Sequence, residues 1–300
     1  MISSLQYIET PIHEISDPIL TDAGLRLIIK REDLNHPLVS GNKWWKLKYN
    51  LSEAKQNNFE TLLTFGGAYS NHIYATAAAA HELGFKSIGI IRGEETHPLN
   101  PTLTFAREKG MHLHYVSRND YRDKTSPAFI HDMQNRFGKF YIIPEGGTNH
   151  YAIKGCIEFA KIISSVPADY VVLPVGTAGT ISGIITGLQG AKQIVGIPVL
   201  KNGTFLYDEI NHWLKIFSSA SYGNWSLLTS YHHGGYAKTT PALLQFIAMM
   251  KDKHDLPLDP VYTGKLLWAV FEEIKKGNFK RGSTILAIHT GGLQGALNVI

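Results

Sequence analysis

The sequence predicts an α/β fold with two open, twisted, mostly parallel sheets flanked by helices. Short apolar runs alternate with amphipathic segments of helical length over most of the 300 residues, a pattern typical of parallel strands joined by helices. The run YVVLPV at 170–175 is apolar throughout, as expected for a strand buried on both faces. The pattern restarts after EGGTN at 145–149, so we expect two lobes with a ligand-binding cleft between them.

The first block of this pattern begins with a strand at 61–65 that ends at a Gly-Gly pair. Ser70 is the expected N-cap of a helix over 71–83, and Gly84 is the residue expected to end that helix. The further elements of this block are strands at 87–91, 111–116 and 140–144 and helices at 101–110 and 127–138. We predict that they form a small domain over residues 47–155.

The second block begins with a helix at 150–164, followed by the strand at 170–175, a glycine-rich turn and another helix. Its later elements are strands at 194–199, 225–229 and 284–288 and helices near 204–217, 240–253 and 263–276. The first 46 residues contain a strand-like segment at 25–30. We predict that residues 1–46 join residues 156–300 in a large domain.

The composition excludes several classes of protein. The chain is 44% hydrophobic and 18% charged, with a net charge of +4, and its basic residues are scattered, so nucleic-acid binding is not expected. The N-terminus lacks a signal-peptide pattern, and no apolar run approaches the roughly 20 residues that span a membrane. A single cysteine, Cys156, excludes an intramolecular disulfide and is expected to be a small buried residue. These features favour a cytoplasmic protein that does not engage a membrane.

The stretch GTAGT, residues 176–180, lies between a predicted strand and a predicted helix. Small residues at this point let backbone N–H groups converge on an anion at the helix N-terminus. No Lys-Ser/Thr pair follows the glycines, and the stretch does not match G-x-G-x-x-G. It therefore indicates either a phosphate or carboxylate site or a plain tight turn.

Polar residues also follow the strands at 61–65 and 284–288. Helix capping explains Ser70 but not Asn71 and His72, which lie in a first helical turn that can also bind a carboxylate. Thr290, in HTGG at 289–292, is placed either to face a ligand or to cap the next turn. These stretches leave a structural and a functional interpretation open.

The stretch SGNKWWKLKYNL, residues 40–51, combines buried and charged side chains in one helical pattern. Trp44, Leu47 and Leu51 recur at spacings of three and four and are expected to face a core. Lys43 and Lys46 then lie together on another face, because positions i and i+3 are neighbours on a helix. No counter-charge for these two lysines is visible in the sequence.

Seven motifs follow one another along the chain: SGNKWWKLKYNL, GGAYSNH, PEGGTN, VGTAGTISGI, GGYAK, DPVYTGK and HTGG. Together they resemble the D-cysteine desulfhydrase and 1-aminocyclopropane-1-carboxylate deaminase family, from about residue 10 to the C-terminus. These are pyridoxal-phosphate enzymes of the tryptophan-synthase-β fold type, also called fold type II. The resemblance implies a pyridoxal 5′-phosphate cofactor in the interdomain cleft, bound by the large domain, a small amino-acid substrate and a homodimer.

By this resemblance, Lys43 is the lysine that bonds to the cofactor aldehyde. Desolvation beside buried aromatic side chains suits this role, because it lowers the pKa of an ammonium group and frees the amine as nucleophile and base. Lys46 occupies the position that meets the cofactor phosphate, and Asn42 helps to orient the neighbourhood. The phosphate cradle implied by the resemblance comprises Gly176, Thr177, Ala178, Gly179 and Thr180.

The resemblance assigns the other polar side chains to the cofactor ring or to the substrate. Asn71 bonds the ring hydroxyl, Ser70 lies near the substrate α-carbon and carboxylate, and His72 either contacts substrate or is only structural. The remaining positions are Tyr262 beside the ring for stacking or acid/base work, Tyr236 at the substrate, and Thr290 as partner of the pyridine nitrogen.

Thr263 is the position that separates the activities of the family. Deaminases that open the cyclopropane ring carry glutamate there, which pairs with the protonated pyridine nitrogen of the cofactor and strengthens the electron sink. D-Cysteine desulfhydrases carry threonine, whose hydroxyl leaves that nitrogen largely unprotonated. We therefore expect α,β-elimination on D-cysteine or a similar small D-amino acid, giving pyruvate, ammonia and the leaving group. The alternatives are 1-aminocyclopropane-1-carboxylate deaminase, an amino-acid racemase, or a catalytically inactive cofactor-binding homologue.

Two features depart from the family pattern or from its chemistry. Trp45 stands where the family usually has a polar residue, and the sequence assigns it no role. The adjacent histidines His232 and His233 are expected to make loop hydrogen bonds rather than to bind a metal, because further ligands at matching spacing are missing from the sequence. No metal is therefore expected.

Overall fold

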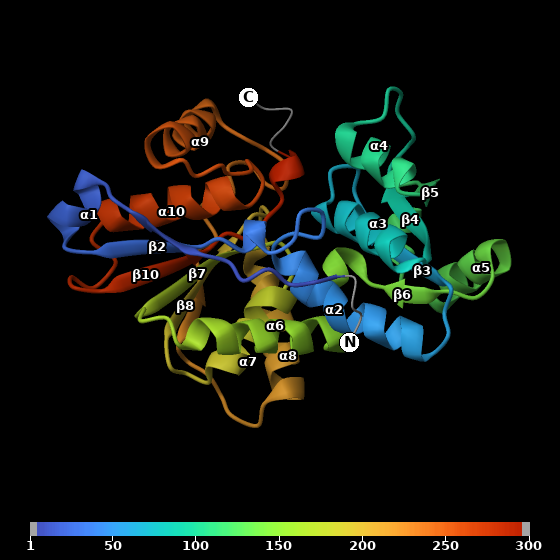
Figure 1. The fold of residues 1–300 in the computed structure, drawn as a ribbon, viewed down its shortest axis with the longest axis horizontal. Coiled ribbons are helices and arrows are strands. Elements are labelled where there is room, and N and C mark those ends of the chain that lie inside the picture. The colour runs from blue at the N-terminus through green and yellow to red at the C-terminus, as the bar shows by residue number, and fades with distance from the viewer. Residues whose placement is uncertain (1–4, 296–300) are drawn as a thin grey trace.

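The structure is a computed structural model that describes residues 5–295 (Figure 1). It contains two sheets, one of six strands in the order β1-β2-β10-β7-β8-β9 and one of four strands in the order β5-β4-β3-β6. All strand pairs are parallel except β1 with β2. The predicted α/β class with two mostly parallel sheets is therefore confirmed.

The large sheet carries helices on both of its faces (Figure 1). Its strands are β1 (Ile12–Ile15), β2 (Arg26–Lys30), β7 (Tyr170–Val175), β8 (Gln193–Pro198), β9 (Trp225–Leu227) and β10 (Thr284–Ile288). One face packs on α6 (His150–Ser164), α7 (Gly179–Leu188) and α8 (Leu206–Phe217), and the other packs on α1 (Pro18–Ala23), α9 (Pro241–His254) and α10 (Thr263–Lys275). Alternate residues of β7 join the two cores: Val171 faces one and Val172 the other, as the period of two in a strand requires.

The small sheet is built in the same way. Its strands are β3 (Thr61–Gly66), β4 (Lys86–Arg92), β5 (Met111–Val116) and β6 (Tyr141–Ile143), and its covering helices are α3 (Asn71–Leu83), α4 (Pro101–Glu108) and α5 (Pro127–Phe137). Leu63 packs with the α5 side, whereas Ile91 packs with α3 and α4. This sheet and its helices lie within the predicted span 47–155, and that division of the chain stays a prediction.

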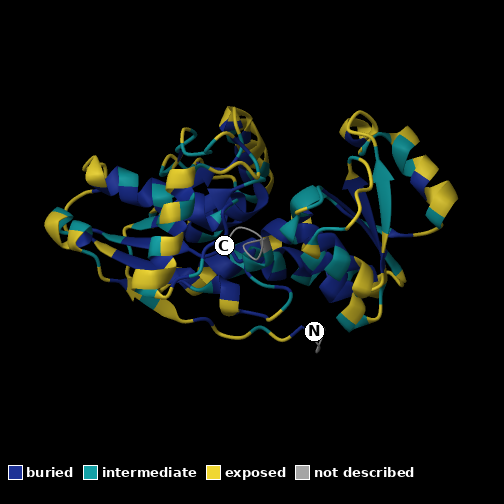
Figure 2. Cartoon of the chain, turned by 90° about the horizontal axis from the view of Figure 1, so that it is seen from above, coloured by how far each residue is buried: buried dark blue, intermediate teal, exposed yellow. Residues whose placement is uncertain are grey.

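Helix α2 (Asn42–Gln56) connects the two lobes, because it contacts α6 of the large lobe and α3 of the small lobe. Leu47 and Leu51 are completely buried, as the spacing of apolar residues predicted. Buried residues are concentrated in the sheets and at this junction (Figure 2). No helix within residues 5–295 is long and apolar enough to cross a membrane.

Trp45, which the sequence left without a role, is a core residue at this junction. Its Nε1 donates a 2.7 Å hydrogen bond to Oε2 of the buried Glu32. Its ring lies 5.4 Å from the ring of Phe159 in α6. A Cβ atom at Gly155 would lie 1.9 Å from the Trp45 carbonyl oxygen, so glycine permits the close approach of α2 and α6. Trp45 therefore holds the helix that carries both candidate lysines.

Most of the predicted elements are confirmed, with ends that agree or differ by at most two residues. The lead-in contains two elements that were not predicted, the edge strand β1 and the short helix α1. Strand β1 is only four residues long and pairs antiparallel with β2. Strands this short carry little periodic signal, so long-range pairing decides their existence.

Candidate active site

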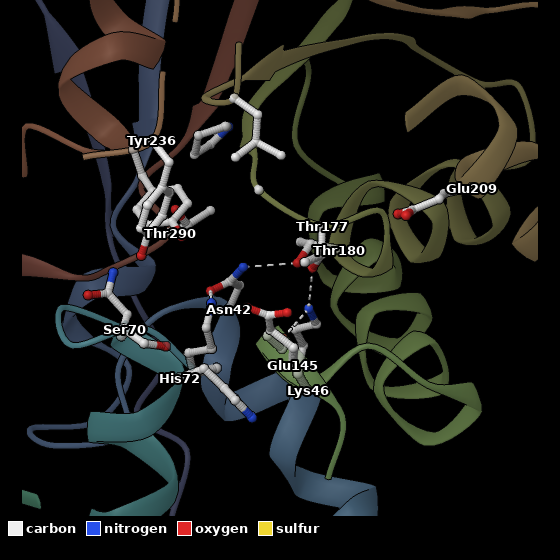
Figure 3. Close-up of a pocket in the computed structure, with 18 of the residues that line it drawn as sticks. Asn42, Lys46, Ser70, His72, Glu145, Thr177, Thr180, Glu209, Tyr236 and Thr290 are labelled. Atoms are coloured by element: carbon white, nitrogen blue, oxygen red, sulfur yellow. Dashed lines mark hydrogen bonds between the residues drawn. The ribbon is translucent and has the colours of Figure 1, made fainter. Parts of the chain in front are cut away.

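A cavity of about 330 Å³ lies between the lobes, at the carboxyl ends of strands from both sheets (Figure 3). Strand β7 runs into the GTAGT turn there, and β3 runs into the segment that begins α3. This is the position at which parallel sheets bind ligands. The predicted site residues that line it are Lys43, Lys46, Ser70, Asn71, His72, Gly176, Thr177, Thr180, Tyr236, Tyr262 and Thr290.

Lys43 is placed by a close contact between the GNK turn and the HTGG turn. Gly41, the N-cap of α2, has φ 69°, and a Cβ atom there would lie 1.9 Å from the Thr290 carbonyl oxygen. The Lys43 Nζ donates a 2.9 Å hydrogen bond to Oδ1 of Asn42. Burial, and then the charge of Lys46, lower the pKa of Lys43 to about 7. A substantial fraction of this amine is therefore neutral, and nucleophilic, at neutral pH.

Lys46 is almost completely buried, and its ammonium contacts only neutral oxygens. Its Nζ donates hydrogen bonds to Gly146 O at 2.5 Å, to Thr148 Oγ1 at 2.9 Å and to Thr177 Oγ1 at 3.2 Å. Burial lowers its pKa to about 8. Within residues 5–295 it makes no ion pair with a carboxylate. A buried ammonium without a counter-charge is costly, so this position favours a bound anion.

The GTAGT turn places its hydroxyl groups around Lys46 (Figure 3). Thr177 Oγ1 lies 2.8 Å from Thr148 Oγ1, and Thr180 Oγ1 accepts a 2.9 Å hydrogen bond from Asn42 Nδ2. Helix α7 begins at Gly179, where a Cβ atom would lie 2.8 Å from Thr148 Oγ1. The turn therefore joins a helix N-terminus, hydroxyl groups and an ammonium, which together form an anion site.

Two of the predicted cradle residues do not line the cavity. The methyl group of Ala178 is fully buried in the hydrophobic core rather than in the cavity. Gly179 has no side chain to offer, and its value is the space it leaves for Thr148 and Lys46. Only the backbone of these two residues is available to a ligand, because neither has a side chain in the cavity.

Ser70, Asn71 and His72 were the three residues predicted to contribute to the site at the start of α3, and each has different hydrogen-bond partners. Ser70 caps the helix, since its Oγ accepts a 3.3 Å hydrogen bond from Ile73 N. Asn71 Oδ1 accepts a 2.9 Å hydrogen bond from Gln294 Nε2, which leaves the Asn71 amide NH₂ group as a donor. A Cβ atom at Gly292 would lie 2.1 Å from Asn71 Nδ2, so the HTGG turn packs directly against this amide. Both residues lie at the cavity, as predicted.

His72 has a structural partner. Its Nε2 lies 2.7 Å from Thr64 Oγ1, and that hydroxyl donates to Ile143 O at 2.8 Å. The hydroxyl proton is therefore committed, so His72 Nε2 is the donor and Nδ1 carries no proton. Burial, followed by the charges of Lys43 and Lys46, holds the pKa of His72 well below its usual value. His72 is a neutral imidazole that joins α3 to strands β3 and β6, which supports the structural alternative.

Tyr236 and Tyr262 lie edge to face at one wall of the cavity, with ring centroids 6.1 Å apart. Burial is the main cause that raises the pKa of both phenols, so both remain protonated near neutral pH. A Cβ atom at Gly176 would lie 2.9 Å from the Tyr262 ring, so the first glycine of GTAGT makes room for this side chain. The two tyrosines are therefore available as proton donors at one wall of the cavity.

Thr263 does not line the cavity. Its hydroxyl donates to Asp259 Oδ1 at 2.7 Å and accepts from Asp259 N at 2.9 Å. The Asp259 carboxylate also accepts hydrogen bonds from the backbone N–H groups of residues 261, 262 and 263. Of the two threonines assigned to the ring nitrogen by resemblance, Thr290 lies at the cavity and Thr263 is committed to the start of α10.

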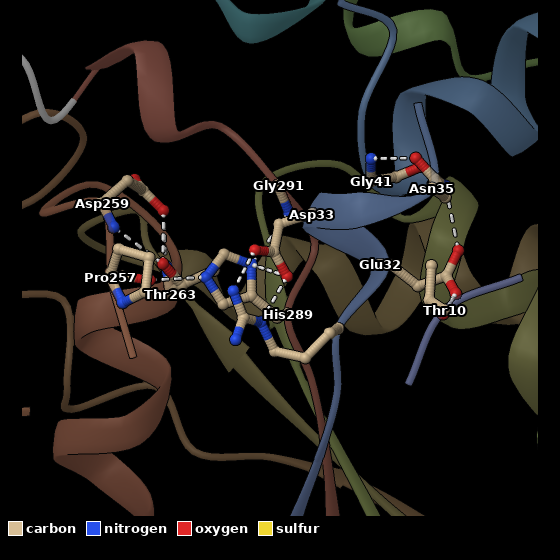
Figure 4. A network of polar contacts seen from close by, with 11 residues as sticks. Thr10, Glu32, Asp33, Asn35, Gly41, Pro257, Asp259, Thr263, His289 and Gly291 are labelled. Carbon is tan, nitrogen blue, oxygen red and sulfur yellow. Dashed lines mark hydrogen bonds and ion pairs between the residues drawn. The ribbon is translucent and has the colours of Figure 1, made fainter. Parts of the chain in front are cut away.

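Two buried carboxylates hold the loops that carry these residues (Figure 4). Glu32 accepts hydrogen bonds from Thr10 and Asn35, and Asn35 in turn bonds both the N–H and the carbonyl group of Gly41. Asp33 Oδ1 lies 3.3 Å from His289 Nδ1, and His289 Nε2 lies 2.8 Å from Pro257 O. The GNK turn, the HTGG turn and the segment before α10 are thereby fixed relative to one another.

The cavity also contains residues to which the sequence assigned no role, although three of them lie in the motifs GGAYSNH and PEGGTN. Charged side chains are contributed by Arg92, Glu145 and Glu209, and the labelled Glu209 stands on α8 with its carboxylate toward the GTAGT turn (Figure 3). The other additional lining residues are Gly67, Gly146, Pro174, Leu200 and Phe205. Arg92 ends β4 and Gly67 follows β3, so their positions at carboxyl ends of parallel strands were the signal that could have identified them.

The adjacent histidines make the expected local hydrogen bonds. His232 Nδ1 accepts from Gly234 N at 3.0 Å, and His233 Nδ1 lies 3.0 Å from Thr240 Oγ1. In the part of the chain that the structure describes, no three His, Cys, Asp or Glu side chains gather as metal ligands. Cys156 is buried, as predicted.

The geometry defines a class of protein. A partly neutral amine, a buried ammonium and a hydroxyl-lined helix N-terminus share one cavity, and this donor set fits a phosphorylated aldehyde. Gln294 occupies Oδ1 of Asn71, so the Asn71 amide NH₂ group remains as a donor at this cavity. The protein is thus an α/β enzyme that holds an aldehyde cofactor between its lobes.

Comparison with known proteins identifies the family. Residues 3–291 match the family described as pyridoxal-phosphate dependent enzyme. The chain is 32% identical to a bifunctional D-cysteine desulfhydrase/1-aminocyclopropane-1-carboxylate deaminase, mitochondrial, of Arabidopsis thaliana, over 97% of this chain and 78% of the relative. It is 29% identical to a putative 1-aminocyclopropane-1-carboxylate deaminase of Pyrococcus horikoshii, over 97% of this chain and 91% of the relative.

A solved structure supports the same conclusion. The crystal structure of an ACC deaminase homologue superposes with a TM-score of 0.85 and 28% identity, covering 99% of this chain and 95% of the other. The chain therefore belongs to the D-cysteine desulfhydrase/1-aminocyclopropane-1-carboxylate deaminase family of pyridoxal-phosphate enzymes, with fold type II. Its cofactor is pyridoxal phosphate.

Proposed function

We propose that this enzyme catalyses α,β-elimination on D-cysteine or a similar small D-amino acid, releasing pyruvate, ammonia and the leaving group. The observation that carries this proposal is the environment of Thr263. Its hydroxyl is bonded to Asp259, and both Asp259 oxygens are occupied by hydrogen-bond donors. No free carboxylate is therefore offered from the position at which ring-opening deaminases carry glutamate.

The cofactor and the protein divide the work of this reaction. When bound, pyridoxal phosphate supplies an electron-accepting ring that makes the substrate α-proton acidic. Lys46, Thr177 and the N-terminus of α7 hold the phosphate. Lys43 would bond to the cofactor aldehyde, because its depressed pKa leaves part of the amine neutral.

Proton transfer in the proposed reaction uses the chain's own side chains. The Lys43 amine accepts the α-proton, and its pKa of about 7 matches a base that operates near neutral pH. The Ser70 hydroxyl accepts from Ile73 N, which leaves its own proton free to donate. Tyr236 and Tyr262 remain protonated and face the cavity, so we assign them to the leaving group and substrate side.

A second candidate is 1-aminocyclopropane-1-carboxylate deaminase. Relatives at 29% identity and the superposed structure carry that description, so the comparisons favour it as strongly as D-cysteine desulfhydration. Racemisation is a third candidate, because it begins with removal of the same α-proton. The residues around Thr263 are the reason we place elimination first.

A substrate panel tests the proposal. Pyruvate release is measured with D-cysteine, β-chloro-D-alanine, L-cysteine and 1-aminocyclopropane-1-carboxylate, and racemisation is followed by chiral chromatography. We expect turnover of the two D-amino acids. Turnover of the cyclopropane amino acid alone, or racemisation without pyruvate, would refute the assignment based on Thr263.

The proposal also includes a homodimer, which the resemblance implies, and a cytoplasmic location, which the composition favours. The homodimer is tested by light scattering on the purified protein, with an expected mass of twice the chain mass of 33.3 kDa. A mass equal to that of one chain would remove the homodimer from the proposal.

A further inference from the structure

Arg92 is a charged residue at the cavity that the proposed reaction leaves without a role. It ends strand β4 in the small lobe and lines the cavity. Its Nη2 would lie 3.5 Å from a Cβ atom at Gly67, so it borders the segment that leads to Ser70. Its guanidinium lies 5.7 Å from the centre of the Tyr121 ring, and its charge also acts on Tyr236 in the opposite lobe. Arg92 therefore faces the space between the two lobes.

The charge of Arg92 is not neutralised by the protein. Among residues 5–295, its guanidinium makes no ion pair and no side-chain hydrogen bond. Glu145, the small-lobe carboxylate that also lines the cavity, pairs with Lys124 at 3.2 Å. Arg92 lines the cavity but is itself exposed to solvent, so its guanidinium is accessible to a ligand that enters, and its five donors form a planar fork that matches an oxyanion.

In the proposed reaction, the cofactor phosphate and the substrate α-carboxylate already have partners in the protein. The cofactor phosphate is met by Lys46 and the GTAGT turn. The substrate α-carboxylate is expected at the N-terminus of α3, beside Ser70 and Asn71. Arg92 is the cation that remains for a third anionic group, and the group that is left is the substituent on the substrate β-carbon.

We infer that Arg92 is a specificity-determining residue that binds an anionic β-substituent. On this inference, which rests on the proposed elimination, the preferred substrates are small D-amino acids whose leaving group is an oxyanion. D-Serine O-sulfate is a simple representative of this class. The cyclopropane amino acid has no such group.

The reaction balances for this substrate. Lys43 accepts the α-proton, the Cα–H electron pair forms the Cα=Cβ bond, and the Cβ–O bond breaks so that sulfate leaves with its electron pair. The released 2-aminoacrylate tautomerises, and one water hydrolyses it to pyruvate and ammonium. Arg92 accepts no electrons and no protons, and it acts by two charge-assisted hydrogen bonds to the departing oxyanion.

The test compares two substrates that give the same product. The cofactor-loaded wild type, Arg92→Met, Arg92→Lys and the control Arg122→Met are assayed for pyruvate with D-serine O-sulfate and with β-chloro-D-alanine. Arg122 is exposed and lies outside the cavity lining. The cofactor absorbance and the melting temperature of each variant confirm that it is folded and loaded.

The measured quantity is the ratio of kcat/KM for the sulfate ester to kcat/KM for the chloride. We expect this ratio to fall roughly 10- to 100-fold in Arg92→Met, as the loss of a hydrogen bond to a charged group implies. Arg92→Lys should retain part of the ratio, because it keeps the charge but loses the fork, and Arg122→Met should equal the wild type. An unchanged ratio in Arg92→Met overturns the inference, including the case in which both substrates lose rate equally because Arg92 binds the shared α-carboxylate.

A binding measurement separates this inference from the proposed function. If the wild type releases pyruvate from neither substrate, the proposed elimination fails. The affinity for D-serine O-sulfate is then read from the change in cofactor absorbance. Binding weakened in Arg92→Met but not in Arg122→Met keeps Arg92 as an oxyanion-binding residue, whereas equal binding overturns it.

Discussion

Lys46 is the residue for which the structure gives the sharpest quantitative prediction. Its three hydrogen bonds are to neutral oxygens, with no carboxylate paired to it in the described part of the chain. In Lys46→Met the phosphate loses one charge-assisted contact, which contributes about 1.5–3 kcal/mol. Because about 1.4 kcal/mol corresponds to tenfold in affinity, we expect Kd to rise roughly 10- to 100-fold.

The assay must isolate the phosphate from the aldehyde. Pyridoxine 5′-phosphate, which has no aldehyde, is titrated into cofactor-free protein and followed by fluorescence. Lys48→Met is the matched control, because Lys48 lies on the same helix but pairs with Glu158 at 2.6 Å and does not line the cavity. It should bind like the wild type.

The pH dependence gives a second signature of Lys46. Its pKa of about 8 in the cofactor-free protein means that the ammonium is lost above pH 8, while the bound phosphate favours the ammonium. The wild-type affinity should therefore fall by up to about tenfold per pH unit above pH 8, and Lys46→Met should lack this slope. A Kd for Lys46→Met within about twofold of the wild type, with the slope retained, would refute the reasoning.

Three further outcomes are expected. Gly41→Ala should weaken cofactor binding and destabilise the fold, because the added Cβ atom meets the Thr290 backbone. The control Gly84→Ala has φ 75° and open space around the added Cβ atom. It should lower the free energy of unfolding by only about 1–2 kcal/mol, through left-handed strain. In urea unfolding, Trp45→Phe should lower the free energy of unfolding by about 1.5–3 kcal/mol, because it removes the hydrogen bond to Glu32. Trp44→Phe should lower it by less, because Trp44 Nε1 has no partner among the described residues. Equal decreases in the two variants would contradict this. The folded pKa values of Lys43 and Lys46, about 7 and about 8, lie below the usual value near 10.4. Between these limits the unfolded chain binds more protons than the folded chain, so the free energy of unfolding of the cofactor-free protein should rise with pH across that window. The rise should vanish in the Lys43→Met/Lys46→Met double variant.

The sequence predicted the fold because its local and long-range signals agree. The buried strand β7, the capped helix α3 and the Pro-initiated helices each carry a pattern that extends over several residues. The apolar face of α2 was predicted from the spacing of Trp44, Leu47 and Leu51, whereas its contacts with both lobes were found only in the structure. Strand β1 was missed because it is short and exists through its pairing with β2.

The sequence predicted those parts of the site that a single continuous stretch of residues forms. The GTAGT turn and the two lysines were found in this way, and they do share a cavity. Arg92 was missed because it lies in none of the seven motifs, although its position at the carboxyl end of β4 was a signal for it. Thr263 was placed at the ring from its motif, whereas the nearby Asp259 turns its hydroxyl away, a contact that depends on the folded turn.

Reduction of the cofactor-loaded enzyme with borohydride, followed by peptide mapping, tests the central claim most directly. Lys265 is the rival, because it is also buried, and burial lowers its pKa to about 8. Its ammonium, however, is bonded to His232 O and Gly235 O. We predict the reduced cofactor on the peptide that contains Lys43, and no labelled peptide in Lys43→Ala. A label on Lys265 or Lys46, or a label that persists in Lys43→Ala, would contradict the account.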